Sequence, residues 1–220
     1  LQYKDLAKSE LLGFYMDDES FQKSIIHHGF IQYLKARIPN PPLWIQKGFA
    51  VFFEKSTYSD DTQEAAFKEN LVWVKTIKRI ATLETGTDFI SLPTLLNIDV
   101  DTANKSIEAF YAESWGLVSF LAFSDKKIYN RILWDSISVM DPAATMAGNG
   151  SAIISKVFSW VSTDQFYADF EKFLTNVKTF PELVTDGMAL YTKNDMDLAE
   201  RSFLRAIERN ENHDIPYYYL

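Results

Sequence analysis

Apolar residues along the chain recur mainly at spacings of three and four, and this periodicity predicts a mainly α-helical protein. The predicted helices cover residues 2–13, 19–37, 43–55, 62–83, 103–124, 126–140, 150–160 and 162–177, and a further helical section opens at Pro181. Residues 84–102 and 141–150 contain Gly or Pro among scattered small and polar residues, which predicts loops. No segment alternates strictly, so the pattern leaves open only a short edge hairpin, which would make the fold α+β.

Three kinds of local signal set the predicted helix boundaries. The run Pro39-Asn40-Pro41-Pro42 ends the helix before it, because proline cannot continue a helix. Ser162-Thr163-Asp164 supplies an N-cap for the helix that ends near Val177. The acidic runs Asp17-Asp18-Glu19 and Asp60-Asp61 are predicted to begin helices, since the helix dipole favours carboxylates there.

The C-terminal section, residues 180–213, carries small and aromatic residues at spacings that suit two closely packed helices. These residues are Gly187, Tyr191, the turn Asn194-Asp195, Ala199, Phe203 and Ala206. Ala199 and Ala206 permit close approach, and Phe203 fills the space between the helices. The pattern resembles a tetratricopeptide repeat, although Glu211 stands where the repeat has proline.

A plain helical hairpin is the alternative to a repeat at this place. Tyr217 and Leu220 would begin a second repeat, and the ends of the sequence suggest a piece cut from a longer chain. A single repeat cannot bury its own apolar face, so it must pack on the preceding domain or on further repeats.

Composition and charge narrow the classes of function. The net charge of −8 disfavours binding to a phosphate backbone, so no nucleic-acid partner is expected. The absence of cysteine excludes disulfides, thiolate metal sites and a cysteine nucleophile. No run of about eighteen apolar residues occurs, so no membrane span is expected. Aromatic residues make up 15% of the chain, which predicts a core or a groove built from rings.

Three stretches of the sequence carry a resemblance to one enzyme family. They are His27-His28-Gly29-Phe30-Ile31-Gln32-Tyr33-Leu34, the segment Pro42-Leu43-Trp44-Ile45-Gln46-Lys47-Gly48-Phe49-Ala50-Val51-Phe52-Phe53-Glu54, and Tyr111-Ala112-Glu113-Ser114-Trp115 with the apolar run after it. Together they resemble the gluzincin zinc metallopeptidases, in particular the peptidase MA-like group. The resemblance implies a zincin-like helical domain over residues 1–179, followed by the repeat section at 180–220.

The resemblance also implies a metal site, because the family carries a His-Glu-x-x-His helix and a later Glu-Gly pair. Two histidines four residues apart lie on one helical face and bind zinc, and the glutamate between them activates a zinc-bound water. A third ligand comes from the glutamate before the glycine.

This chain departs from the family pattern at nearly every position of that site. His27 stands at the first ligand position and His28 at the general-base position. Ile31 occupies the second ligand position, and Lys47 occupies the third. Val51 replaces an acidic residue that supports the ligands. A branched alkyl side chain and an ammonium cannot bind zinc, so we expect no metal, no cofactor and no zinc peptidase activity.

The remaining cleft suggests binding in place of catalysis. Residues proposed to line it are His27, Trp44, Lys47, Glu113 and Trp115, with Lys47 replacing the lost ion as a positive charge that faces Glu113 or Glu54. We therefore expect a non-catalytic module that binds a protein or peptide through the cleft or through the repeat surface. The resemblance favours a bacterial cell-envelope setting.

Two alternatives remain open at this stage. One is a hydrolase with zinc-independent chemistry, in which His27 or His28 acts as acid and base and Lys47 stabilises negative charge. The other is a structural spacer that only presents the repeats.

Overall fold

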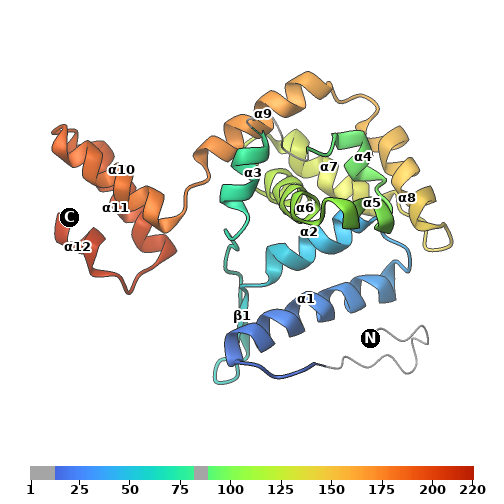
Figure 1. Ribbon diagram of the computed structural model, residues 1–220, viewed down its shortest axis with the longest axis horizontal. Coiled ribbons are helices and arrows are strands. Elements are labelled where there is room, and N and C mark those ends of the chain that lie inside the picture. Colours follow the sequence, from blue (N-terminus) through green and yellow to red (C-terminus); the bar gives the residue numbers. More distant parts are fainter. Residues whose placement is uncertain (1–12, 82–88) are drawn as a thin grey trace. The chain divides into compact units, whose positions relative to one another are not determined.

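The computed structural model of the protein describes residues 13–81 and 89–220, and it is mainly helical with one small antiparallel hairpin (Figure 1). This confirms the predicted fold class. The helices are α1 (Asp18–Arg37), α2 (Leu43–Phe53), α3 (Val74–Ala81), α4 (Leu92–Leu96), α5 (Val100–Lys105), α6 (Ile107–Phe123), α7 (Lys127–Ser138), α8 (Met146–Ile153), α9 (Thr163–Asn176), α10 (Phe180–Thr192), α11 (Met196–Arg209) and α12 (Asp214–Tyr219). A π-helical turn, Ile154–Phe158, extends α8.

The chain divides into two compact units between Phe173 and Leu174, a few residues before the predicted boundary, and each unit is described by itself. Among the described residues, no helix combines the length and the apolar character that crossing a lipid bilayer requires.

Helix α6 is the centre of the first unit, with α2, α3, α4, α5 and α7 packed around it (Figure 1). Nearly every residue from Ala109 to Leu121 is buried, which is the pattern of a helix covered on all sides. Trp115 and Phe120 are among the largest fully buried side chains. The core of the unit is therefore built around this helix.

The crossing of α2 over α6 is made possible by Gly48. A Cβ atom at this position would lie 2.5 Å from the Ser114 carbonyl oxygen and 2.7 Å from the Val118 Cγ2 atom. Such distances are far inside van der Waals contact, so only glycine permits the two backbones to lie this close. Trp44, one turn before Gly48, is fully buried in the same interface region.

Helix α1 begins and ends where its sequence signals predict. The Asp17 side chain caps the helix by accepting a hydrogen bond from the Ser20 backbone N–H at 2.8 Å. The helix stops at Arg37, just before the proline-rich run. Its buried residues, His27 and Ile31, are four positions apart and so lie on one face. Helix α1 packs against α2.

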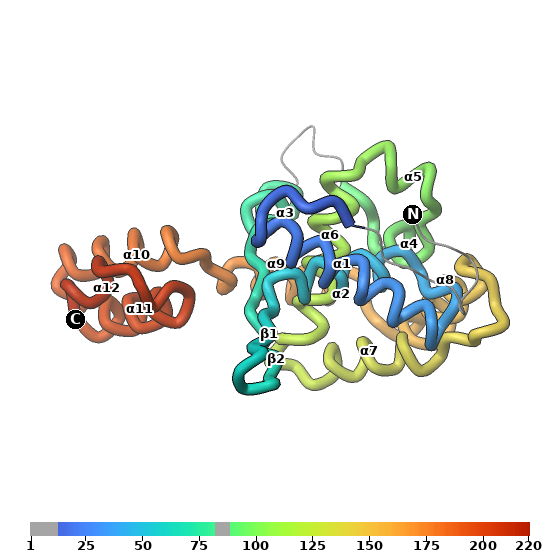
Figure 2. The backbone as a smooth tube through the Cα atoms, turned by 90° about the horizontal axis from the view of Figure 1, so that it is seen from below, coloured from blue at the N-terminus to red at the C-terminus, as the bar shows by residue number. Residues whose placement is uncertain are grey.

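The predicted helix over residues 62–83 is wrong in its first half. Strands β1 (Thr57–Ser59) and β2 (Glu64–Ala66) form a hairpin there, with Tyr58 opposite Ala65. Gln63, with a φ of 57°, makes the tight turn, and the Asp60-Asp61 run lies in that turn instead of at a helix start. Both views place the hairpin at an edge of the unit, away from α4 and α5 (Figures 1 and 2).

Two predicted loops contain short helices. Helix α4 lies within the predicted loop 84–102, and α5 begins in that loop and ends at Lys105. Pro93 does not prevent α4, because it stands in the first turn of that helix, where proline is tolerated. Asp99 caps α5 by accepting from the Thr102 N–H at 2.7 Å. Helix α8 begins at Met146, capped by Thr145, inside the predicted loop 141–150. The helix predicted over 2–13 lies almost wholly outside the described residues, as do residues 84–88.

The second unit is a helical hairpin of α10 and α11, followed by α12. Asn194 adopts a φ of 61° in the connecting turn, as the predicted Asn194-Asp195 turn requires. Gly187 on α10 faces Phe203 on α11, and a Cβ at Gly187 would meet the Phe203 ring at 2.6 Å. Ala199, Phe203 and Ala206 are buried, so the predicted contact residues do join the two helices.

We expect Gly48→Ala to destabilise the protein by about 2 kcal/mol, because the added methyl group forces α2 away from α6. The matched control is Gly29→Ala on α1, where a Cβ meets nothing within 4 Å. That variant should stabilise the protein by about 0.5–1 kcal/mol, since alanine favours the helix. Urea unfolding followed by circular dichroism measures both changes, and equal effects of the two substitutions would refute the close-contact argument.

Candidate functional site

A polar pocket of about 630 Å³ opens between α1, α2 and the N-terminal part of α6. Helix α1 contributes Lys23, His27 and His28, and α2 contributes Lys47 and Val51. Glu54 at the end of α2, Tyr111 on α6 and Trp73 complete the wall used below. On α2 the residues Lys47, Val51 and Glu54 are spaced by four and three, so one face of the helix supplies all three.

The Glu54 carboxylate contacts three other polar side chains at this pocket. Its Oε1 atom accepts a hydrogen bond from His27 Nδ1 at 2.6 Å, and both side chains are buried. Its Oε2 atom accepts from Asn70 Nδ2 at 3.1 Å and lies 3.4 Å from the Lys23 ammonium. Three partners therefore offset the cost of burying this carboxylate.

Asn70 ties the segment after the hairpin to the end of α2. It is 1% exposed, and its Nδ2 atom also donates to the Val51 carbonyl at 2.9 Å. Its Oδ1 atom accepts from the Val72 N–H at 3.3 Å. With these contacts the Asn70 side chain holds both Glu54 and the backbone of α2, which fixes the floor of the pocket.

Lys47 brings an ammonium group into the pocket without a carboxylate to pair with it. Its Nζ atom lies 5.9 Å from the centre of the Tyr111 ring, and within residues 13–81 and 89–220 it forms no salt bridge. Burial lowers the pKa of Lys47, and the nearby Lys35 charge lowers it further, whereas Glu54 opposes the shift. The pocket thus holds a positive charge that an anionic group would relieve.

The pKa values of two ring side chains near Lys47, His28 and Tyr111, are also shifted. Partial shielding from solvent lowers the pKa of His28, and His27 and Lys47 act in the same direction. Burial raises the pKa of Tyr111, with a smaller contribution from Glu54. The Tyr111 ring stacks on Trp73 with centroids 6.1 Å apart, so one wall of the pocket is aromatic.

The structure places the predicted site residues in four different surroundings. His27, His28, Lys47 and Val51 do line one pocket. Ile31 is buried and lines a neighbouring pocket of about 380 Å³, which also includes His28 and Lys47.

Three predicted cleft residues lie elsewhere. Trp44 and Trp115 are 0% exposed and belong to the core around α2 and α6, so neither can touch a ligand in the cleft. Glu113 does not face Lys47 and instead lines a separate pocket near α9. The reason is helical geometry: Tyr111 faces Lys47, and a residue two positions later is turned by about 200°.

Glu54 and Asn70 are the important residues that sequence reasoning underrated. Glu54 was considered only as a partner of Lys47, and its bond to His27 joins residues 27 positions apart. Asn70 lay inside a wrongly predicted helix, so its buried side chain had no expected role. The one available signal was the position of Glu54 seven residues after Lys47, which places both on one helical face.

The residues of this pocket do not fit a zinc ion. Of the three expected ligand positions only His27 has a side chain that can bind zinc, because Ile31 has no donor atom and Lys47 carries a positive charge. Over the described parts of the chain, no group of three or more His, Cys, Asp or Glu side chains is placed to hold a metal ion.

The comparisons give a family but no activity. A family model described as a protein of unknown function, DUF1570, matches residues 18–142, which is more than half of the chain. The match includes α1, α2 and α6, and so every pocket residue discussed above. No curated protein and no solved structure matches the sequence.

We expect Glu54→Ala to destabilise the protein by about 3 kcal/mol, because His27 and Asn70 each lose a buried acceptor. Glu19→Ala is the matched control, since Glu19 also pairs with a lysine, Lys55, but is exposed to solvent. It should change stability only slightly. Chemical unfolding monitored by tryptophan fluorescence measures both, and a small loss for Glu54→Ala would show that the pair does not organise the pocket.

Proposed function

The chain belongs to the DUF1570 family, and from that premise we propose that its cleft is a non-catalytic binding site in a module that recognises a protein or peptide. In this proposal the first unit descends from a zinc peptidase-like domain whose metal site has been lost. The observation that carries it is a buried His27–Glu54 pair beside a Lys47 ammonium that has no salt-bridge partner within residues 13–81 and 89–220, at positions where the family resemblance expects a metal-binding set.

The geometry of His27 supports descent from a metal site. In metal centres a ligating histidine commonly donates its second ring nitrogen to a carboxylate, which fixes the ring for the ion. His27 donates in this way to Glu54, yet the positions that would supply the other ligands are Ile31 and Lys47. The supporting contact is kept while the ligands are gone, and catalysis through a bound ion has no place here.

The charge of the pocket favours a ligand with a carboxylate. Lys47 and Lys23 line it, and the Lys47 ammonium has no salt-bridge partner among residues 13–81 and 89–220. A Glu or Asp side chain, or a C-terminal carboxylate, would gain a charge-assisted hydrogen bond from Lys47. The stacked rings of Tyr111 and Trp73 offer an apolar wall to a neighbouring side chain of the same peptide.

The helical hairpin of the second unit offers another surface for a partner. A groove of about 480 Å³ along α10 and α11 includes the basic residues Lys178, Lys193, Arg201 and Arg205. If the hairpin is a tetratricopeptide repeat, as its pattern predicts, this surface is the one that would hold a partner protein. The proposal places the peptide carboxylate in the Lys47 pocket. The hairpin groove is the alternative binding surface, and the peptide-binding test below compares the two.

A zinc-independent hydrolase is the second candidate. The lowered pKa values of His28 and Lys47 favour it, because a neutral imidazole is competent as a general base at neutral pH. Among residues 13–81 and 89–220, no hydrogen bond joins His28 to a serine or threonine, and His27 bonds to Glu54, so binding without turnover accounts for more of the pocket.

Descent from a zinc site predicts that the metal can be restored. In His28→Glu/Ile31→His/Lys47→Glu, the first unit regains two histidines four apart, a general base and an acidic ligand. We expect this triple variant to bind zinc stoichiometrically in calorimetric titrations and the wild-type protein not to. Ile31→His alone is the control and should not bind. Stoichiometric zinc in the wild-type protein, purified without added metal, would overturn the proposal.

The binding proposal predicts that an acidic peptide is held and not cut. The probe is a fluorescein-labelled peptide of Glu and Leu residues with a free C-terminus, and its Lys–Leu counterpart is the control peptide. Fluorescence anisotropy should show saturable binding that Lys47→Glu abolishes, while Lys127→Glu, an exposed charge reversal on α7, leaves it intact.

The same samples separate the alternatives. Mass spectrometry should find the peptide uncleaved after incubation, whereas cleavage unaffected by chelator would establish the hydrolase. If Arg201→Glu in the second unit abolishes binding and Lys47→Glu does not, the hairpin is the binding surface and the cleft proposal is wrong.

A further inference from the structure

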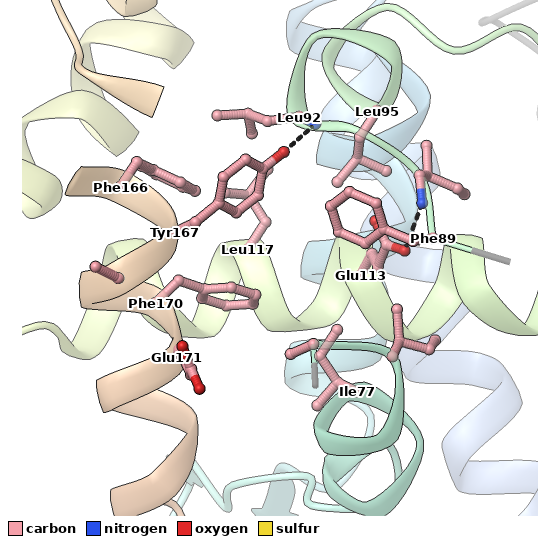
Figure 3. Close-up of a pocket in the computed structure, with 14 residues that line it drawn as sticks. Ile77, Phe89, Leu92, Leu95, Glu113, Leu117, Phe166, Tyr167, Phe170 and Glu171 are labelled. Atoms are coloured by element: carbon pink, nitrogen blue, oxygen red, sulfur yellow. Dashed lines mark hydrogen bonds between the residues drawn. The ribbon is translucent and has the colours of Figure 1, made fainter. Parts of the chain in front are cut away.

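A second, largely apolar pocket of about 330 Å³ lies on another side of α6 (Figure 3). Helix α3 contributes Ile77, α4 contributes Leu95, and α6 contributes Leu117. Helix α9 closes the pocket with Phe166 and Phe170. The pocket is separate from the Lys47 cleft, with which it shares no lining residue. Its volume is at the lower end of the range, about 300–1,000 Å³, that small-molecule sites occupy.

One buried carboxyl group lies in this apolar lining. Glu113 is 6% exposed, and its Oε1 atom accepts a hydrogen bond from the Ile90 backbone N–H at 2.9 Å. Its Oε2 atom has no hydrogen-bond partner in the described parts of the chain. Figure 3 shows the Glu113 side chain directed from α6 toward Phe89. One oxygen is therefore held in place, and the other is available to a ligand.

The surroundings favour the neutral form of this carboxyl. The other titratable residues that line the pocket are Tyr167 and Glu171, both on α9, and neither is a cation. Tyr167 uses its hydroxyl oxygen to accept from the Leu92 N–H at 2.7 Å. Arg79 on α3 contacts Glu108 instead, at 3.5 Å.

Burial raises the pKa of Glu113 to about 8, against the opposing effect of the Ile90 hydrogen bond. At neutral pH the group is then mainly a carboxylic acid, with a proton to donate. Glu54 differs from it because Glu54 has His27, Lys23 and Asn70 as partners. A buried carboxyl without such partners is a common feature of ligand sites.

We propose that this pocket binds a small apolar molecule that carries one hydrogen-bond acceptor, such as an amide or ketone oxygen, and that the Glu113 carboxyl donates to that acceptor. The tail of the molecule would pack against Ile77, Leu117 and Phe170, and the head group would meet Glu113 Oε2. A cationic amine fits less well, because binding it requires the carboxyl to ionise among apolar side chains.

The test compares three probes with the same tail: N,N-dimethyloctanamide (hereafter octanamide), which has an acceptor oxygen and no N–H donor, octylamine and sodium octanoate. Isothermal titration calorimetry on the full chain should show octanamide binding most tightly at neutral pH. Its affinity should fall about tenfold between about pH 6.5 and about pH 9.5, since the ionised carboxylate has no proton to donate. The loss should follow the titration of Glu113.

Two variants isolate the contribution of Glu113. Glu113→Gln keeps a donor at every pH, so octanamide should bind it with an affinity that no longer changes over this range. Glu171→Gln is the matched control, a carboxylate of the same pocket, and should keep the wild-type pH dependence. Ala168→Phe, at an exposed position of the lining, should block binding of all three probes.

Three results would overturn the proposal. The first is the absence of saturable octanamide binding by the folded wild-type protein. The second is an octanamide affinity that is the same at both pH values in the wild type. The third is octylamine binding that exceeds octanamide binding and grows with pH, because that would make Glu113 the anion of a cation site.

Discussion

The contact between α2 and α6 at Gly48 is the constraint on which both pockets depend. Because a glycine allows the Ser114 carbonyl to lie against α2, the two helix axes run close together and the large rings of Trp44 and Trp115 are enclosed. Helix α2 then presents Lys47 and Glu54 on one side. Helix α6 presents Tyr111 to the same cleft and Glu113 to the opposite pocket. This one close crossing therefore positions the side chains of both pockets.

The buried carboxyl groups of Glu54 and Glu113 in the first unit show that the partners of a buried carboxyl determine its role. Glu54 and Glu113 are almost equally shielded, at 7% and 6% exposure. Glu54 is held by an imidazole, an amide and an ammonium, and its role is to organise the cleft floor. Glu113 has one backbone hydrogen bond and an apolar lining, which raises its pKa and leaves it able to donate. Similar burial thus leads to a structural group in one case and a candidate ligand group in the other.

The cleft combines a histidine fixed by a carboxylate with an ammonium group. His27, bonded to Glu54, lines a pocket in which Lys47 supplies positive charge. An anionic peptide group would satisfy that charge, which is why binding is the function that these residues support best. The match to the DUF1570 family covers residues 18–142 of this unit and leaves the helical hairpin, with its own basic groove, outside the match.

Local signals in the sequence determined helices α1, α2, α6, α7 and α9 and the contact residues of the C-terminal hairpin, because periodicity and capping act over a few neighbouring residues. They also determined that Ile31 and Lys47 supply no zinc ligand, whatever the fold. Only the tertiary structure decided that residues 57–66 form a hairpin and that Glu54 meets both His27 and Asn70. It also decided that Glu113 turns away from Lys47. These outcomes depend on contacts between residues far apart in the chain, for which a single sequence carries no local signal.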